Sequence, residues 1–145
     1  MTKKLMTFVV ILIAGLLSVA KADDDRRITI AQLPSQAQLF IKSNFRGKNV
    51  AYVTKDRDGL RSDYEVKFKD GSSIDFDHNG RWTDIESRSL PSKLVPGQIR
   101  SYVAKNHPGQ KVVKISRERS GYDIELSDDT DLEFNKNFHI VEIDD

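Results

Sequence analysis

Apolar and polar residues alternate along two stretches of the chain, and the second stretch repeats the first. In residues 64–86, Tyr64, Val66 and Phe68 alternate with charged residues. The same pattern returns in residues 122–144, at one constant offset and without a gap. Alternation with a period of two is typical of strands that bury one face and leave the other wet. The sequence therefore predicts two copies of an antiparallel sheet.

Turn signals divide each copy into strands. Asp70-Gly71 and Asn79-Gly80 separate three alternating segments of the first copy. Both pairs favour tight hairpin turns, because their residues tolerate a positive φ. A further strand is predicted ahead of them at Val50–Val53, and Val112–Ile115 takes this position in the second copy. Each copy is thus expected to form a meander of four strands.

A helix is predicted before each meander. The chain places Pro34 and Pro96 at the starts of these helices, where a missing N–H is harmless, and Gly47 and Gly109 at their ends. The apolar stripes consist of Ala37, Phe40, Ile41 and Phe45 in the first helix, and of Ile99, Tyr102 and Val103 in the second. The helices and the first strands repeat at an offset of 62 residues, whereas the three later strands repeat at an offset of 58. The loop at residues 56–63 is therefore expected to be longer than its counterpart in the second copy.

The predicted fold is α+β: two tandem helix–four-strand-meander repeats forming one antiparallel sheet of about eight strands, with two helices on one face. The predicted repeats are residues 23–88 and 89–145. A lone core of about 60 residues is marginal in stability. Fusion of the two halves into one sheet also removes one exposed edge from each.

Residues 1–22 have the organisation of a secretory signal peptide. Lys3 and Lys4 precede an apolar run, Met6–Leu17, and Ala20-Lys21-Ala22 supplies a cleavage site of small residues. An anchoring helix is the alternative, but about 12 apolar residues fall short of the roughly 20 that span a bilayer. We therefore expect cleavage after Ala22, a periplasmic or secreted protein, and no membrane insertion after cleavage.

Composition narrows the classes of function. Loss of the leader, with three basic and no acidic residues, changes the formal net charge from +1 to −2. This near-balance argues against nucleic-acid binding, which needs a basic patch. The chain has no cysteine, and it lacks the Gly-x-Ser-x-Gly motif that carries the nucleophile of many serine hydrolases. The sequence therefore predicts that the protein is not an enzyme and needs no cofactor. A hydrolase of unknown type is the third hypothesis, after the two binding functions described below.

The opposite phase of each strand predicts an open, solvent-facing surface of the sheet. Its expected members are Tyr52, Glu65, Lys67, Asp75, Asp77, Trp82, Asp84, Glu86, Lys114, Asp123, Glu125, Asp131, Glu133, Ile140 and Glu142. Tyr52, Trp82 and Ile140 are large apolar groups on this face, and aromatic residues dominate binding hot spots. With Glu65 and Glu125 they are the predicted contacts for a protein or peptide. The alternative for Trp82 is ordinary cross-strand packing.

The second copy's face is the more acidic, which favours a basic partner by charge complementarity. The predicted function is therefore a monomeric, non-catalytic binding module that binds or inhibits a protein or peptide through the open face. The sequence does not identify the partner.

Asp75–Glu86 fits the calcium-loop pattern D-x-[DN]-x-[DN]-G-x5-E. An EF-hand places that loop between two helices, whereas these flanks alternate as strands. A hairpin turn at Asn79-Gly80 is therefore the favoured interpretation, and no metal site is predicted. The alternative is a weak calcium site formed by Asp75, Asp77 and Asn79, in a calcium- or small-ligand-binding periplasmic protein. His78, His107 and His139 lack the paired spacing of zinc ligands.

The tandem motifs resemble the PepSY-like family of exported proteins, also described as putative β-lactamase-inhibitor-like. The matching segments are Leu33-Pro34, Phe40-Ile41-Lys42, Phe45-Arg46-Gly47, Tyr64–Gly71 and Ile74–Trp82, with a second copy from Pro96 to Asp145. The resemblance implies a periplasmic or secreted α+β protein that binds another protein through its open sheet face. It carries no motif specific to β-lactamase inhibition.

Overall fold

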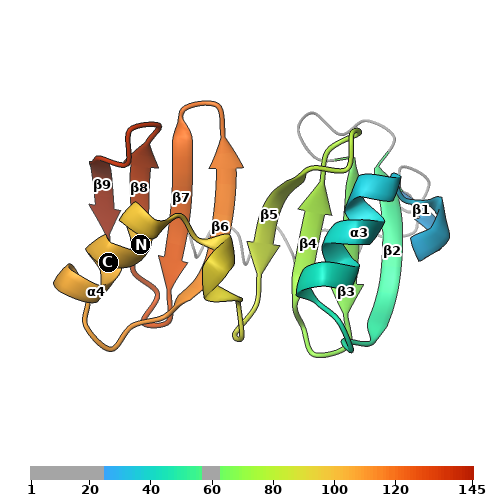
Figure 1. The fold of residues 1–145 in the computed structure, drawn as a ribbon, viewed down its shortest axis with the longest axis horizontal. Coiled ribbons are helices and arrows are strands. Elements are labelled where there is room, and N and C mark those ends of the chain that lie inside the picture. Colours follow the sequence, from blue (N-terminus) through green and yellow to red (C-terminus); the bar gives the residue numbers. More distant parts are fainter. Residues whose placement is uncertain (1–24, 57–62) are drawn as a thin grey trace, which may run out of the picture.

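The computed structural model describes residues 25–56 and 63–145. The predicted signal peptide and its cleavage site lie outside the described residues, as does most of the loop at 56–63. Within the described part, two α-helices and one nine-stranded antiparallel sheet confirm the α+β class (Figure 1). Each strand in this sheet neighbours the strand before it in the chain.

The first half of the chain contains one helix and five strands of the sheet. Its elements are β1 (Asp25–Ile28), the 3-10 turn η1 (Ile30–Gln32), α3 (Ser35–Asn44), β2 (Val50–Asp56), β3 (Tyr64–Phe68), β4 (Ser73–Phe76) and β5 (Trp82–Glu86). As expected, α3 follows a proline and is followed by Gly47 in the left-handed region, at φ 84°.

The second half contains the other helix and four strands. Its elements are the 3-10 turn η2 (Ser92–Leu94), α4 (Gly97–Asn106), β6 (Val112–Glu118), β7 (Gly121–Leu126), β8 (Asp131–Asn135) and β9 (Ile140–Asp144). Gly109, with a φ of 85°, repeats the role of Gly47 after α4.

Strand β1 makes the sheet one strand wider than the sequence predicts. It pairs antiparallel with β2, and its Ile28 lies opposite Val53. The sequence Asp-Arg-Arg-Ile has no apolar alternation of its own, so only the available edge of β2 defines it as a strand. Leu33 is buried and Ile30 is half-buried against the core.

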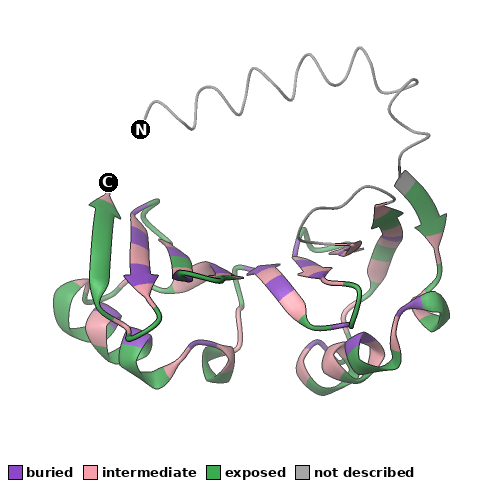
Figure 2. Cartoon of the chain, turned by 90° about the horizontal axis from the view of Figure 1, so that it is seen from above, coloured by how far each residue is buried: buried purple, intermediate pink, exposed green. Residues whose placement is uncertain are grey.

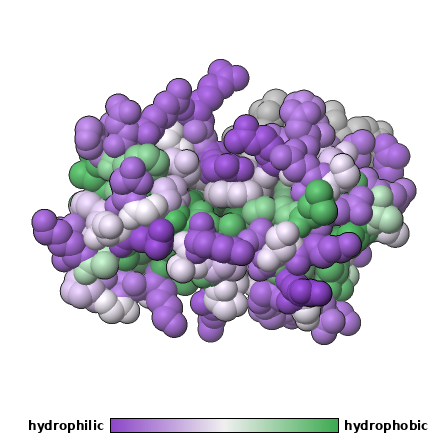
Figure 3. Space-filling model, in the orientation of Figure 1, coloured by the Kyte–Doolittle hydropathy of each residue, from purple (hydrophilic) through white to green (hydrophobic). Residues whose placement is uncertain are grey.

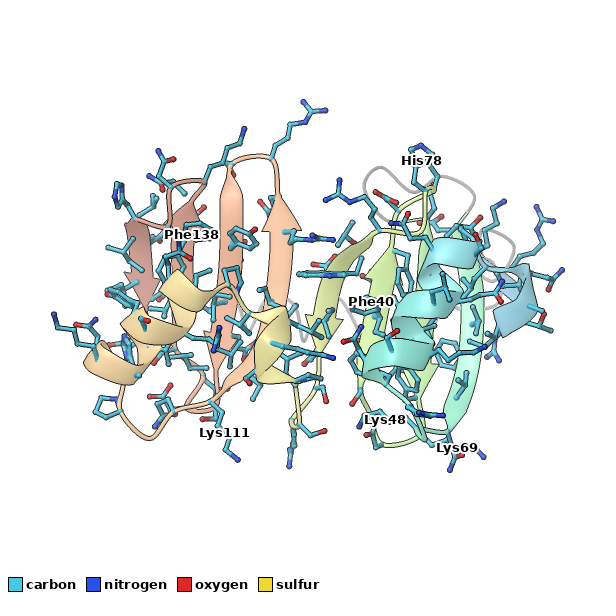
Figure 4. All side chains as sticks on the ribbon, in the orientation of Figure 1. Phe40, Lys48, Lys69, His78, Lys111 and Phe138 are labelled. Carbon is cyan, nitrogen blue, oxygen red and sulfur yellow. The ribbon has the colours of Figure 1, made fainter. Side chains whose placement is uncertain are left out.

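Both helices cover the same face of the sheet, and the core lies between these two layers (Figure 2). Its largest fully buried side chains are Val66, Phe68, Ile74, Phe76, Ile85, Ile99, Ile115, Ile124, Leu126, Leu132 and Phe134. Aromatic contacts join the helices to the strands. Phe45 beside α3 stacks on Phe68 at 5.4 Å, and Tyr102 on α4 meets Phe134 edge-on at 5.4 Å. Figure 4 shows Phe40 on the helix side of the sheet, where its ring lies 5.9 Å from Phe76.

Four β-bulges interrupt the pairing of the sheet. One extra residue stands between paired positions at each, namely Ala51, Thr83, Val113 and Val141. A bulge reverses the inward and outward phase of the residues beyond it and bends the strand. The bulges therefore decide which side chains at the strand ends face the helices.

The two halves join where β5 pairs with β6. Ile85 lies opposite Ile115, and both are fully buried. On the other face, the Ser116 hydroxyl donates a hydrogen bond to Asp84 Oδ1 at 2.5 Å. This junction turns two small sheets into one continuous sheet with a shared interior.

Arg117 lies directly beyond the last residue of β6 that pairs with β5. Its guanidinium carbon lies 3.8 Å from the centre of the Trp82 ring, and Nε and Nη2 donate to the Trp82 carbonyl oxygen at 3.2 and 2.8 Å. Burial, together with the nearby charge of Arg81, lowers the pKa of Arg117 below its usual value. Phe40 packs on the same indole, at 6.4 Å between ring centres.

We predict that Arg117→Ala lowers the free energy of unfolding by about 1–3 kcal/mol, since it removes a cation–π contact and two charged hydrogen bonds. Urea denaturation followed by fluorescence measures this directly, because Trp82 is the single tryptophan. Arg119→Ala, at an exposed position of the following turn, is the matched control. Equal losses in the two variants would show that the contact with Trp82 adds no stability.

Carboxylates cap the equivalent turns of the two halves. Asp70 accepts hydrogen bonds from Lys48 Nζ at 2.5 Å and from the Ser72 N–H at 2.8 Å, which lower its pKa from 3.8 to about 2. Figure 4 shows Lys48 at this end of the first half. Asp128 occupies the equivalent position of the second half, where Thr130 lowers its pKa by the same kind of hydrogen bond, without a lysine.

We predict that Lys48→Met raises the pKa of Asp70 toward 3.8 and leaves that of Asp128 unchanged. Because the folded pKa is depressed, the stability that Asp70 contributes is complete above about pH 4 and is lost as the pH falls toward 2. NMR titration of the carboxyl carbons measures both values. An unchanged Asp70 in the variant would contradict a role for the lysine.

Candidate functional site on the open sheet face

The face of the sheet opposite the helices is polar and concave. Figure 2 shows the two ends of the sheet, β1 and β9, bending away from the helices. Asp84 lies at the centre of this face, and its carboxylate accepts hydrogen bonds from the hydroxyls of Ser116 and Thr83. The bulged strands curve, which makes this open face concave.

A hollow of about 580 Å³ lies on this face over the second half of the chain. We call it the acidic hollow. Its lining residues are Lys114, Ser116, Asp123, Ile124, Glu125, Asp129, Asp131, Leu132, Glu133, Glu142 and Asp144. Seven of these carry a carboxylate, whereas Lys114 carries the one positive charge among them.

The acidity distinguishes the second half from the first. In the first half Lys67 and Ser73 occupy the positions of Glu125 and Asp131, at the offset that the strands share. Glu125 is paired across the strands with both Lys114 and Asp131. The same fold therefore presents a mixed surface in one half and a concentrated negative surface in the other.

Three of the predicted contact residues lie on the open face. Glu125 lines the acidic hollow, whereas Glu65 lies in the first half, opposite Thr54 and Asp75. Tyr52 lies opposite Lys67 with its ring partly covered by Arg27, whose guanidinium carbon is 4.6 Å from the ring centre. These residues are spread over both halves and do not form one cluster.

The predicted positions of Trp82 and Ile140 on the open face are wrong. Trp82 lies opposite Phe76, and Ile140 lies opposite Phe134, so both turn toward the helix side. The cause is a bulge directly after each residue, at Thr83 after Trp82 and at Val141 after Ile140. Each bulge reverses the alternation that the sequence pattern assumes. For Trp82 the cross-strand alternative describes its contacts better than an exposed hot spot.

One residue of the alternative calcium site already caps a turn. Asp77 Oδ1 accepts hydrogen bonds from the backbone N–H groups of Asn79 and Arg81, at 2.9 and 3.0 Å. Asn135 caps the equivalent turn in the same way. In the described part of the chain, no group of three or more His, Asp or Glu side chains is placed to hold a metal ion.

The sequence pattern missed part of the lining of the hollow. Asp129 reaches it from a turn, with a φ of 74°, where strand alternation gives no information. Asp144 and Ser116 lie at strand positions of the correct phase and could have been found by extending that phase. The observation that pointed to the site was the density of carboxylates in the second copy.

Several solved structures are similar to this chain, and three of them come from Bacteroides. A structure from Bacteroides thetaiotaomicron, described as a putative calcium-regulated periplasmic protein, is 38% identical with a TM-score of 0.81. It matches 86% of this chain and 99% of its own. A putative periplasmic protein of the DUF2874 family from Bacteroides vulgatus ATCC 8482 is 36% identical, with a TM-score of 0.80 and the same coverage of both chains.

A second protein from Bacteroides vulgatus ATCC 8482 is described as a putative periplasmic protein of unknown function. It is 30% identical, with a TM-score of 0.77, over 83% of this chain and 99% of its own. No curated protein matches the chain. Among the described residues, neither helix is long and apolar enough to cross a membrane.

A family model matches the chain twice, over residues 22–68 and 62–142, and these two matches together cover most of it. The two-fold match accords with the repeat in the sequence and with the helix and strands found in each half. The chain belongs to the PepSY-like family, described as putative beta-lactamase-inhibitor-like.

Proposed function

We propose that the protein is a non-catalytic periplasmic binding module, which acts as a monomer and binds a basic segment of a protein or peptide in the acidic hollow. The observation that carries this proposal is the concentration of seven lining carboxylates against one lysine. Complementary charge speeds association and selects the partner. The export signal predicted at residues 1–22 and the periplasmic descriptions of three similar structures support the location.

The geometry of the hollow suits a flexible cationic chain. Its floor is made of strands β6 to β9, so its carboxylates stand in rows at the spacing of alternate strand residues. Alternate residues of an extended peptide have the same spacing, so lysine or arginine side chains at alternate positions can each reach a row of carboxylates. The family description suggests that binding inhibits the partner, although no residue motif identifies an enzyme.

Calcium is the second candidate ligand. The 38% identical relative is described as calcium-regulated, and carboxylate oxygens are the ligands that Ca²⁺ prefers. The hollow carries seven carboxylates, whereas at the turn of Asp75, Asp77 and Asn79 Asp77 already caps the backbone. No three of the described carboxylates stand around one point in this structure, so calcium binding in the hollow would require them to move together. Calcium bound in the hollow would compete with a basic segment.

We predict that neutralising the hollow with Glu125→Gln/Asp131→Asn/Glu133→Gln weakens binding of a capped lysine-rich peptide by about tenfold or more, as expected for loss of charge complementarity. Calorimetry at two salt concentrations measures the affinity. The matched control is Glu65→Gln/Asp75→Asn/Glu86→Gln, which removes the same charge from the first half. Equal weakening in both variants would mean that only net charge matters.

Thermal melts with calcium and with chelator test the second candidate on the same proteins. A rise in Tm with calcium that the hollow variant loses, and the control variant keeps, would place the ion in the hollow. An unchanged Tm in the wild-type protein would exclude calcium as a stabilising ligand of the folded chain.

A further inference from the structure

Apolar side chains of the second half reach the surface along strand β9. This strand is last in the sheet order, so it pairs only with β8. Four large apolar side chains are exposed in the described part of the chain, and three of them are Ile140, Val141 and Ile143 on β9. Figure 2 shows the strand exposed along its length, and Figure 3 shows apolar atoms at the edge where Figure 1 draws β9.

The equivalent edge of the first half is covered within the chain itself. Ile85 and Thr83, which are the counterparts of Ile143 and Val141 in the repeat, are 0% and 8% exposed. On β9, Ile143 and Val141 are 49% and 60% exposed. The difference follows from one strand, because β6 pairs with β5 and no strand of the described chain pairs with the outer edge of β9. β9 therefore presents the surface that β6 covers on β5.

The bulge in β9 does not prevent such pairing. Edge strands are often protected by bulges, which disturb the row of hydrogen-bonding groups. However, β5 has its bulge at the equivalent residue, Thr83, and still pairs with β6 through Asp84–Glu86. The corresponding segment of β9 is Glu142–Asp144, beyond the bulge at Val141.

Strand β6 shows which chemistry fits this edge. On the open face its Lys114 lies opposite Glu86, and on the helix side its Ile115 lies opposite Ile85. At the positions of Glu86 and Ile85, β9 carries Asp144 and Ile143. The outer edge of β9 thus has the same negative charge and the same apolar residue as the edge of β5 that β6 covers.

The third paired position, that of Ser116 opposite Asp84, also keeps its chemistry on β9. Ser116 of β6 donates a hydrogen bond to Asp84, and β9 carries Glu142 at the position of Asp84. A strand that fits β9 therefore alternates basic or hydroxyl residues with an aliphatic one.

We propose that β9 is a docking edge at which an extended segment of a partner protein adds as a tenth, antiparallel strand. Addition of a strand to a sheet edge gives affinity through backbone hydrogen bonds and specificity through alternate side chains. The basic side chains of the segment enter the acidic hollow, which Glu142 and Asp144 also line, while its aliphatic residue covers Ile143. This inference rests on the proposed function, because it specifies how a basic segment reaches the hollow.

A second copy of this chain fits the edge less well. Two-fold antiparallel pairing of Glu142–Asp144 and its neighbours, centred on Glu142, would set this residue against the same residue of the other copy. Like charges directly opposite each other destabilise a strand pair. The carboxylates of the two hollows would also lie on the same side of the joined sheet.

The test uses residues 23–145 and a capped, fluorescent peptide with the sequence of residues 111–118, Lys-Val-Val-Lys-Ile-Ser-Arg-Glu. Anisotropy gives the affinity for the wild-type protein and for Ile143→Asp, with Leu39→Asp as control because Leu39 on α3 is 63% exposed. We expect binding that Ile143→Asp weakens about tenfold and Leu39→Asp leaves unchanged. Electrostatic attraction alone would make Ile143→Asp bind the cationic peptide more tightly, which would overturn the proposal.

Two N-methylated peptides add a test of backbone pairing. Each carries N-methyl groups at alternate residues, so each blocks one edge of the peptide strand. Strand addition predicts that one version binds like the unmodified peptide and the other loses binding. Equal affinity of the two versions, whether retained or lost, would overturn the proposal.

The outcomes separate this inference from the proposed function. Loss of peptide binding in Glu125→Gln/Asp131→Asn/Glu133→Gln, with no effect of Ile143→Asp or of the methylation pattern, would retain the hollow and reject the docking edge. Sensitivity to the edge changes alone would reject the hollow and support strand addition. Dimerisation of the wild-type protein in sedimentation, lost in Ile143→Asp and without peptide binding, would assign the edge to a second copy.

Discussion

The pairing of β5 with β6 is the interaction on which the rest of the structure depends. Each half of the chain has too few residues for a large core, and each alone would expose a long apolar edge. At the junction Ile85 and Ile115 are fully buried, while the Ser116 hydroxyl donates a hydrogen bond to Asp84 on the polar face. Without such a junction the same position is open to solvent, because Ile143 on β9, the equivalent of Ile85, is half exposed.

Curvature of the sheet gives the polar face its shape. Bulges recur at equivalent places in the two halves, and each bends its strand. A curved sheet with helices on its convex side must present a concave face on the other. Carboxylates on neighbouring strands are thereby turned toward one another in the second half, where a flat sheet would leave them parallel.

The two halves show how one framework acquires different surfaces. Core positions such as Phe76 and Phe134 keep their residue type, because packing between helix and sheet tolerates little change in volume. Open-face positions are free of that constraint, and here Lys67 of the first half corresponds to Glu125 of the second. The surface of each half can therefore diverge without cost to the fold, and the ligand preference of the protein lies in that divergence.

The class of the fold, the helix ends and most of the buried residues could be predicted from the sequence, because alternation, helical spacing and turn residues are local properties. Val66, Ile74 and Phe134 are buried as their phase indicates, and Gly47 takes its left-handed conformation. The faces on which Trp82 and Ile140 lie became clear only from the strand pairing, since a bulge inserts one residue that the alternation does not reveal. The tertiary structure also decided that β1 is a strand and that scattered carboxylates share one hollow. Both outcomes depend on neighbours that are distant in the chain: an available edge in the first case, and the curvature of the whole sheet in the second.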